Sequence, residues 1–244
     1  MDFKRLSLDI PYSDCDSGGR MRPVSVLRAI QEAGLRHAYD MGMNIDEPHA
    51  AGVLLFTTRM HIAFYHPLPR WRESVAIKTW VTEIKRVRAY RAYEMRAGDG
   101  RVAARALLDG VLVDAVSHKP VRFEIGNHIP VAGKADTLAP PRKIKPAGDM
   151  VFMGERYAEW YQTDLNGHVN NIRHAELALS ALPEGYAGRP VRDWTINYLG
   201  ELIPGQRVRL FSHAAEKGTV LTGGRGEDDG EIFRSRIEFA PIHD

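Results

Sequence analysis

Apolar and polar positions follow one order of elements along the first half of the chain. Residues 24–41 repeat apolar or small side chains every three or four positions, which predicts one long helix. A strand-like stretch precedes it, and four further stretches rich in Val, Ile, Thr, Tyr and Trp follow it. The expected strands are 3–11, 53–65, 74–84, 88–97 and 102–115. One helix between a first strand and an antiparallel meander predicts an α+β fold.

The same order of elements restarts in the second half. A helix is expected at 169–182, and strands are expected at 151–161, 190–199, 206–214, 218–225 and 231–239. The turns before the two helices also match, and we align Asp14 with Asp164 and Asp16 with Asn166. Repeats of this kind indicate a duplication.

A stretch rich in Pro, Gly and Lys separates the two halves and is typical of a linker. We therefore expect a domain at 1–125, a linker at 126–149 and a second domain at 150–244. In each domain an antiparallel sheet would wrap a long helix, and side-by-side pairing would make the two sheets continuous. The turns before the helices would then lie where the halves meet, a usual place for a ligand cleft.

Composition narrows the class of protein. The formal net charge is only +2, which argues against a general nucleic-acid binder. The N-terminus lacks the apolar run of a signal peptide, and no stretch approaches the roughly 18 apolar residues of a membrane span. Cys15 is the one cysteine, so no internal disulfide can form. These features favour a cytoplasmic protein.

Positive charge gathers in residues 70–105, where ten Lys or Arg stand against four acids. One interpretation is a set of solvated strand edges, because Lys and Arg protect exposed edges from pairing. The other is a docking face for an acidic partner.

Residues 164–171, DLNGHVNN, hold the densest chemistry in the chain. They place a carboxylate, amides, an imidazole and a glycine directly before a helix, where unpaired N–H groups carry partial positive charge. Such a place suits a developing oxyanion. Gly167 would let the backbone approach a substrate, and Asn170 or Asn171 could cap the helix. The alternative is a purely structural role, in which these residues form a polar turn with an ordinary helix cap.

This motif resembles the signature of plant and bacterial acyl-ACP thioesterases, whose chains are tandem hot-dog domains. The resemblance extends to Gln31-Glu32-Ala33 in the first helix and to the segment 70–73 (RWRE), and it covers nearly the whole chain. It implies hydrolysis of fatty acyl thioesters, with a role in fatty acid biosynthesis.

The resemblance also implies that Asp164, Asn166, His168 and Glu201 carry catalysis. The plant enzymes usually have Cys after this Glu, whereas this chain has Leu202, so a cysteine nucleophile is excluded there.

The residues that remain indicate acid–base chemistry. Glu201, or less favourably Asp164, would activate a water or attack the carbonyl itself. His168 and Asn166 would orient the reactants, and Asp164 would hold one of these two in place. We expect backbone N–H groups at Gly167 and Val169 to stabilise the oxyanion.

The turn in the first half resembles the active-site turn of hydroxybenzoyl-CoA thioesterases, single hot-dog enzymes with one catalytic Asp that Asp16 matches. Asp16, with Asp14 beside it, is therefore either a remnant or a second working site. We favour the remnant, because Gly18 stands where the second turn has His168 in our alignment.

Two rival functions remain open. Hot-dog hydratases use Asp and His five apart, whereas Asp164 and His168 are four apart, which favours the thioesterase. A non-catalytic acyl-binding module needs the same apolar slot but no base. No metal-ligand spacing or nucleotide-binding motif is present, so we expect neither metal nor cofactor.

We expect the acyl chain to lie in a slot between the first helix and its facing strands. The candidate lining residues are Leu27, Ile30, Gly34, Leu54, Phe56 and Met60. Phosphopantetheine of either acyl carrier protein or CoA would present the thioester, since Lys and Arg suit both carriers. A chain with two hot-dog domains already contains the pseudo-dimer, so a monomer or a homodimer is expected.

Overall fold

The computed structural model describes residues 2–43, 53–122, 129–165 and 167–241. The chain divides into two compact units, Met1–Pro141 and Arg142–Asp244, called the first and second unit below. The division falls inside the expected linker 126–149. None of the helices in the described parts of the chain is long and apolar enough to cross a membrane.

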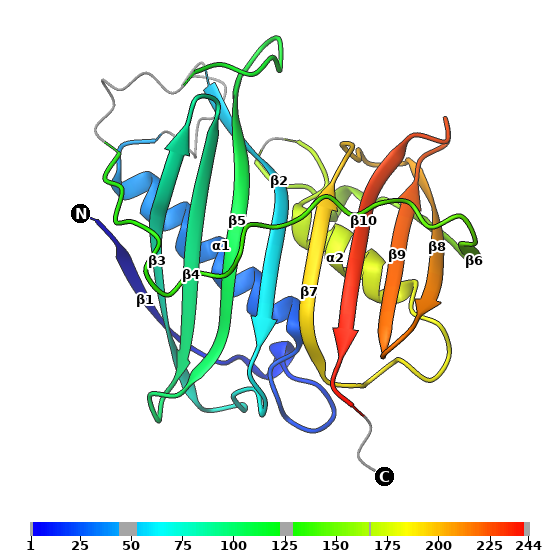
Figure 1. Cartoon of the computed structure of the whole chain (residues 1–244), viewed down its shortest axis with the longest axis horizontal. Helices are drawn as coiled ribbons and strands as arrows, with labels where there is room; N and C mark the ends of the chain where they lie inside the picture. The colour runs from blue at the N-terminus through cyan, green and yellow to red at the C-terminus, as the bar shows by residue number, and fades with distance from the viewer. Residues whose placement is uncertain (1, 44–52, 123–128, 166, 242–244) are drawn as a thin grey trace. The chain divides into compact units, whose positions relative to one another are not determined.

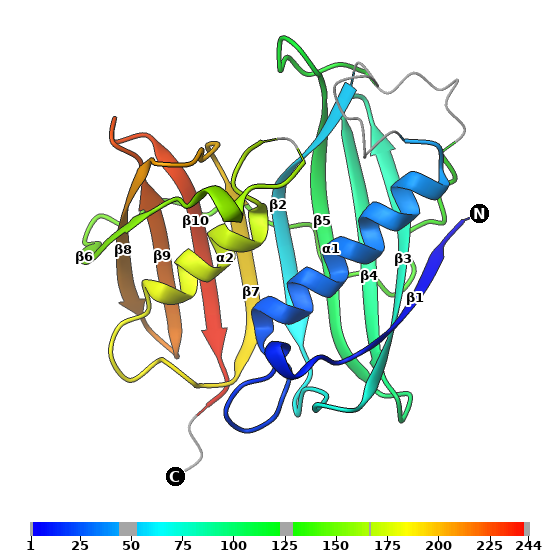
Figure 2. The same cartoon turned by 180° about the vertical axis from the view of Figure 1, so that it is seen from behind.

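The first unit wraps one face of an antiparallel sheet around helix α1 (Pro23–Asp40) (Figure 2). The strand order is β1-β3-β4-β5-β2. The strand bounds are β1 Lys4–Asp9, β2 Val53–Phe64, β3 Ser74–Lys85, β4 Arg88–Ala97 and β5 Val102–Asp114. Pro23 occupies the first turn of α1, because its fixed φ suits a helix start.

The second unit repeats this arrangement around α2 (Asn171–Ser180) (Figure 1). Its strand order is β6-β8-β9-β10-β7, which is the order of the first unit element for element. The strand bounds are β6 Val151–Tyr157, β7 Val191–Tyr198, β8 Arg207–Ala215, β9 Thr219–Arg225 and β10 Glu231–Phe239. The predicted duplication is therefore confirmed, while the joining of the two sheets stays a prediction.

The segment between β5 and β6 is bound to the outer sheet face of each unit, away from the helix. In the first unit, Trp80 Nε1 donates to the Gly133 carbonyl oxygen (3.1 Å). In the second unit, buried Asn197 accepts from the Ile144 N–H (2.8 Å), and Arg234 donates to the Ile144 carbonyl oxygen (2.8 Å). These bonds satisfy polar groups on faces that would otherwise be open to solvent.

Candidate functional site

The motif turn lies between a short 3₁₀ turn (Trp160–Gln162) and α2. Asp164 N–H donates to the His168 carbonyl oxygen (2.9 Å), and Gly167 N–H donates to the Asp164 carbonyl oxygen (3.0 Å). Gly167 has φ +77°, a conformation that glycine adopts without strain. Asn170 caps α2 by accepting from the Ile172 N–H (2.9 Å), which confirms the expected cap. Asn166 lies outside the described residues.

The loop after β7 brings Glu201 to this turn. His168 Nε2 lies 3.5 Å from Glu201 Oε2, and the two side chains are 30% and 46% exposed. The loops are joined by a hydrogen bond from the Val169 N–H to the Leu202 carbonyl oxygen (2.7 Å). An imidazole and a carboxylate thus meet at a site open to solvent, which suits proton transfer to or from a bound substrate.

The expected oxyanion donors at Gly167 and Val169 are not free. Both N–H groups already donate inside the protein, to the Asp164 and Leu202 carbonyl oxygens respectively. The Gly167 N–H closes the turn, and the Val169 N–H joins the two loops. The expectation that these two groups receive the oxyanion stays a prediction, and it would require both hydrogen bonds to be broken or shared.

Cys15 is poorly suited to act as a nucleophile. Burial, together with the neighbouring carboxylates of Asp16 and Asp14, raises the pKa of its thiol. The protonated thiol is a poor nucleophile. Leu202, which stands in the place of the plant cysteine, is buried at 1% exposure.

The corresponding turn of the first unit shows how the two copies align. Asp16 N–H donates to the Arg20 carbonyl oxygen (2.8 Å), just as Asp164 N–H donates to that of His168. Gly19 N–H then donates to the Asp16 carbonyl oxygen, as Gly167 N–H does to that of Asp164. The hydrogen bonds therefore match Asp16, not Asp14, with Asp164, and our sequence alignment was shifted by two positions.

This alignment places Arg20 where the second unit has His168. Arg20 donates from Nη1 to the Leu68 carbonyl oxygen (2.9 Å), in the loop after β2 that corresponds to the Glu201 loop. The Asp16 carboxylate accepts from the Arg20 N–H (2.9 Å), and Asp14 pairs with Arg28 (2.5 Å). The first turn thus keeps the aspartate. It has Arg20 in place of the His168 imidazole, and the loop after β2 brings a backbone carbonyl, not a carboxylate, to that arginine.

A buried histidine lies behind the motif turn. His174 on α2 is 2% exposed, and neither ring nitrogen has a hydrogen-bond partner among the described residues. Its ring packs edge-on against Tyr198 and Phe233, with centroids 5.8 and 6.2 Å away. Burial lowers the pKa of His174 to about 4, and the Asn170 backbone opposes this only in part. The first unit has buried Val26 at this place, so the fold does not require a polar residue.

This histidine predicts a loss of stability in mild acid. Between pH 4 and 6.5 the unfolded chain binds a proton at His174 and the folded chain does not, so stability falls as the pH falls. The free energy of unfolding should drop by about 2 kcal/mol from pH 7.5 to 5 through this group. Urea unfolding of wild type and His174→Phe at both pH values measures it. An equal drop in both proteins would assign the effect to other groups.

The expected slot residues divide between the two faces of the first sheet. Phe56 pairs with Val111 and Met60 with Leu108, and the bulge between Thr57 and Arg59 makes these partners three apart. Phe56 and Met60 therefore lie on opposite faces.

Met60, Leu27, Ile30 and Gly34 belong to the layer between α1 and the sheet. There Leu27 and Ile30 are fully buried. Leu54 packs with Val111 and Phe56 on the outer face. Placing Leu54 and Phe56 in the slot was therefore wrong, because the bulge reverses the alternation.

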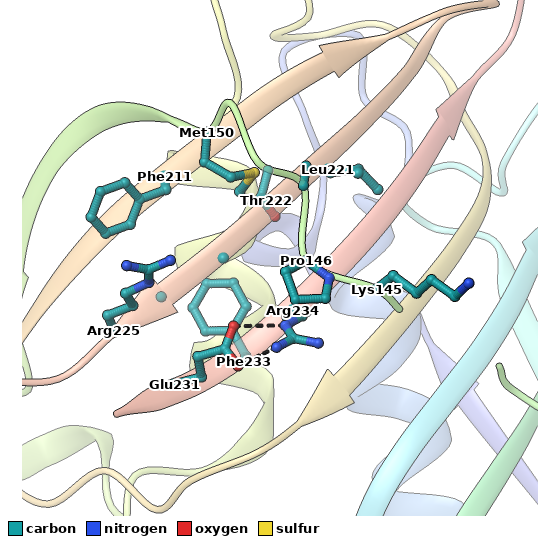
Figure 3. A pocket seen from close by; sticks show the side chains of 13 residues that line it. Lys145, Pro146, Met150, Phe211, Leu221, Thr222, Arg225, Glu231, Phe233 and Arg234 are labelled. Carbon is teal, nitrogen blue, oxygen red and sulfur yellow. Dashed lines mark hydrogen bonds and ion pairs between the residues drawn. The ribbon is translucent and has the colours of Figure 1, made fainter. Parts of the chain in front are cut away.

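A pocket opens on the outer face of the second sheet, between residues 145–150 and strands β8 to β10 (Figure 3). Met150, Phe211 and Leu221 supply apolar surface, and Lys145, Arg225 and the Arg234–Glu231 pair supply charge. None of Asp164, His168 and Glu201 lines it. It is thus separate from the motif turn.

Comparisons with known proteins confirm the resemblance to acyl-ACP thioesterases. The sequence profile of the Thioesterase-like superfamily matches residues 10–130. The chain is 23% identical over 246 residues to dodecanoyl-[acyl-carrier-protein] hydrolase of Cinnamomum camphora, covering 89% of this chain and 62% of that protein. It is 25% identical to the palmitoyl-acyl carrier protein thioesterase of Arabidopsis thaliana, covering 88% and 58%. The chain thus spans less than two thirds of these relatives.

Solved structures show the double hot-dog fold. An acyl-ACP thioesterase from Bacteroides thetaiotaomicron matches with a TM-score of 0.85 at 20% identity, over 98% of both chains. The 12:0-ACP thioesterase from Umbellularia californica matches with a TM-score of 0.82 at 19% identity, also over 98% of both chains. The predicted fold class is confirmed.

Proposed function

We propose that this chain hydrolyses fatty acyl thioesters of acyl carrier protein to a free fatty acid and the carrier thiol. The observation that carries the proposal is the meeting of His168 and Glu201, 3.5 Å apart, at a turn that also bears Asp164. The similarity to proteins named acyl-ACP hydrolases over most of the chain supports the same activity.

In the proposed reaction, Glu201 takes a proton from a water molecule while the oxygen of that water attacks the thioester carbonyl carbon. His168 and the Asn166 amide hold the water and the carbonyl oxygen, and Asp164 fixes the turn that carries both. The tetrahedral intermediate then expels the thiolate, which receives the proton from Glu201. Direct attack by Glu201 is the alternative first step, and it would pass through an anhydride that water hydrolyses.

The experiment that tests this function is hydrolysis of matched acyl-ACP and acyl-CoA series, from eight to eighteen carbons. We expect free thiol to appear with acyl-ACP, and the relative kcat/KM for the two series identifies the carrier. Hydration of crotonyl-CoA without thiol release would instead support the hydratase. Acyl binding with neither reaction would support the non-catalytic module.

The cations in residues 70–105 could contribute to binding of an acidic carrier protein only where they are not already paired within the first unit. Half of the ten cations pair with carboxylates of the first unit, namely Lys85, Arg88, Arg96, Arg101 and Arg105. These ion pairs indicate a structural role for half of the ten cations, but β3, β4 and β5 are inner strands of the sheet, so protection of a sheet edge does not explain them. Arg72, Lys78 and Arg86 have no carboxylate partner among the described residues, and they are the candidates for contact with acidic ACP.

We further propose that the turn of the first unit is a remnant. Asp16→Asn should keep at least about half of the wild-type kcat/KM, whereas Asp164→Asn should lower it by about 10²-fold or more. The matched pair controls for the chemistry of the substitution, because both aspartates lie in equivalent turns. Comparable losses in the two variants would mean that both turns work.

A further inference from the structure

An arginine is buried in the layer between α1 and the first sheet. Arg91 lies in the middle of β4, is 6% exposed, and donates from Nη1 to His37 Nδ1 (2.7 Å). The same nitrogen contacts Thr79 Oγ1 (3.4 Å). Among the described residues, Arg91 forms no ion pair, and its Nε and Nη2 donate no hydrogen bond.

The neighbours of Arg91 do not neutralise it. His37 accepts at Nδ1 from the guanidinium and is itself 1% exposed. Burial raises the pKa of Tyr93, whose hydroxyl bonds to Thr79, so the phenol stays protonated. The layer therefore contains a positive charge with no counter-charge among the described residues, an arrangement that proteins generally avoid unless the charge meets a partner.

The charge lies at one end of the stripe expected to contact the acyl chain. Leu27, Ile30, Gly34 and His37 follow each other every three or four residues along α1, which gives a line of about 15 Å. The Tyr93 hydroxyl covers Gly34, since a Cβ built there would lie 2.5 Å from it. Polar groups thus begin where the apolar part of the stripe ends.

The fold does not require this cluster. Counting back from the matched ends of β2 and β7, the strand register of the second unit places Val220 where the first has Arg91. Val220 is fully buried, and α2 ends at Ser180, before any counterpart of His37. The same fold is thus built with an apolar residue at this position.

We propose that Arg91 is a specificity-determining residue that binds an oxygen-bearing group, a carboxylate above all, carried by the acyl chain. A carboxylate can accept two parallel N–H bonds from the Nε and Nη2 edge of a guanidinium. The substrate class would then be acyl chains that carry such a group. This inference rests on the proposed thioesterase function and names its substrate class.

The test compares two thioesters of equal carbon number, octanoyl and 7-carboxyheptanoyl, on the carrier that the wild type accepts. For wild type, kcat/KM should favour the carboxylated chain. Arg91→Met should lower that preference by about tenfold to a hundredfold, and Arg91→Lys should keep it within a few-fold. Arg122→Met, at an exposed arginine after β5, is the control and should leave the preference unchanged.

Direct binding separates this inference from the function on which it rests. Calorimetry with monomethyl octanedioate and methyl octanoate should show tighter binding of the carboxylated ester to wild type and no such difference in Arg91→Met. If no thioester is hydrolysed but the carboxylated ester is preferred, the function is wrong and the Arg91 site stands. If hydrolysis occurs and wild type shows no preference in either assay, the inference about Arg91 is overturned.

Discussion

Replacing Glu201 with glutamine is expected to lower kcat/KM by about 10²–10⁴-fold, because the amide cannot take the proton that the carboxylate takes. The change keeps the shape of the side chain and removes only its basicity. Glu201 is 46% exposed and its loop is anchored through the Leu202 carbonyl, so the fold should be unaffected. Steady-state hydrolysis of the preferred acyl thioester measures the loss, and the unfolding midpoint checks the fold.

The matched control is Glu216→Gln, at an exposed glutamate before β9 whose backbone carbonyl accepts from the Thr219 N–H. It should retain wild-type kcat/KM. His168→Ala should lose activity on the same scale as Glu201→Gln, and the double variant should be little worse, because residues that act as a unit are not additive. Full activity in Glu201→Gln would remove this residue from the mechanism.

Oxygen-18 water separates the two roles open to Glu201. In a single turnover, a water nucleophile puts the label into the fatty acid and leaves the Glu201 carboxylate unlabelled. Attack by the carboxylate, followed by attack of water on the protein side of the anhydride, labels Glu201 instead. The first result is the expected one.

Hydrophobic periodicity predicted the elements because one face of each sheet packs on its helix, so inward positions recur with the period of the strand or the helix. Residues 88–97 and 231–239 match β4 and β10 to the residue, since turn residues bound both strands on each side. The helix expected at 169–182 is shorter, 171–180, because Asn170 caps one end and α2 stops before Leu182.

Other features depend on contacts that a linear pattern does not contain. The bulge between Thr57 and Arg59 reverses the faces of β2, and nothing in its composition marks it. The alignment of the two turns also needed their hydrogen bonds, because two aspartates, Asp14 and Asp16, compete for one match.

A signal for Arg91 was present in the sequence. Ala89, Tyr93, Met95 and Ala97 alternate along β4 on its buried face, and Arg91 falls in the same series. An arginine among inward positions is exceptional, because Lys, Glu, Arg and Asp are almost never fully buried without a partner. The count of ten cations in residues 70–105 treats Arg91 like the exposed ones and so hides this signal.

Residues 223–225 (GGR) lie inside β9, although paired glycines are more typical of turns. The turn is closed further on, where the Gly226 N–H donates to the Gly230 carbonyl oxygen (2.9 Å). Gly224 has another purpose, because it faces Phe233 across the ladder and leaves room for that ring. A pair of glycines in a strand thus marks a close approach.

Gly224→Ala is expected to destabilise the protein strongly. A Cβ there would lie 2.4 and 2.9 Å from two carbons of the Phe233 ring and 3.0 Å from a Val208 methyl group. Phe233 is fully buried and cannot move away freely. Overpacking should cost about 1–3 kcal/mol, which exceeds the 0.4–1 kcal/mol or so that alanine contributes by restricting the unfolded chain. Urea unfolding measures the difference.

Gly223→Ala is the matched control, one residue away on the opposite face of β9. Its Cβ would meet only the Phe233 carbonyl oxygen at 3.4 Å and Met150 Cε at 3.7 Å, so stability should stay near wild type. Equal destabilisation by the two variants would mean that strand flexibility, not the Phe233 ring, sets the requirement. The Phe233 ring packs against His174, and Phe233 is the strand partner of Tyr198, three residues before Glu201. Gly224→Ala should therefore also lower kcat more than Gly223→Ala does.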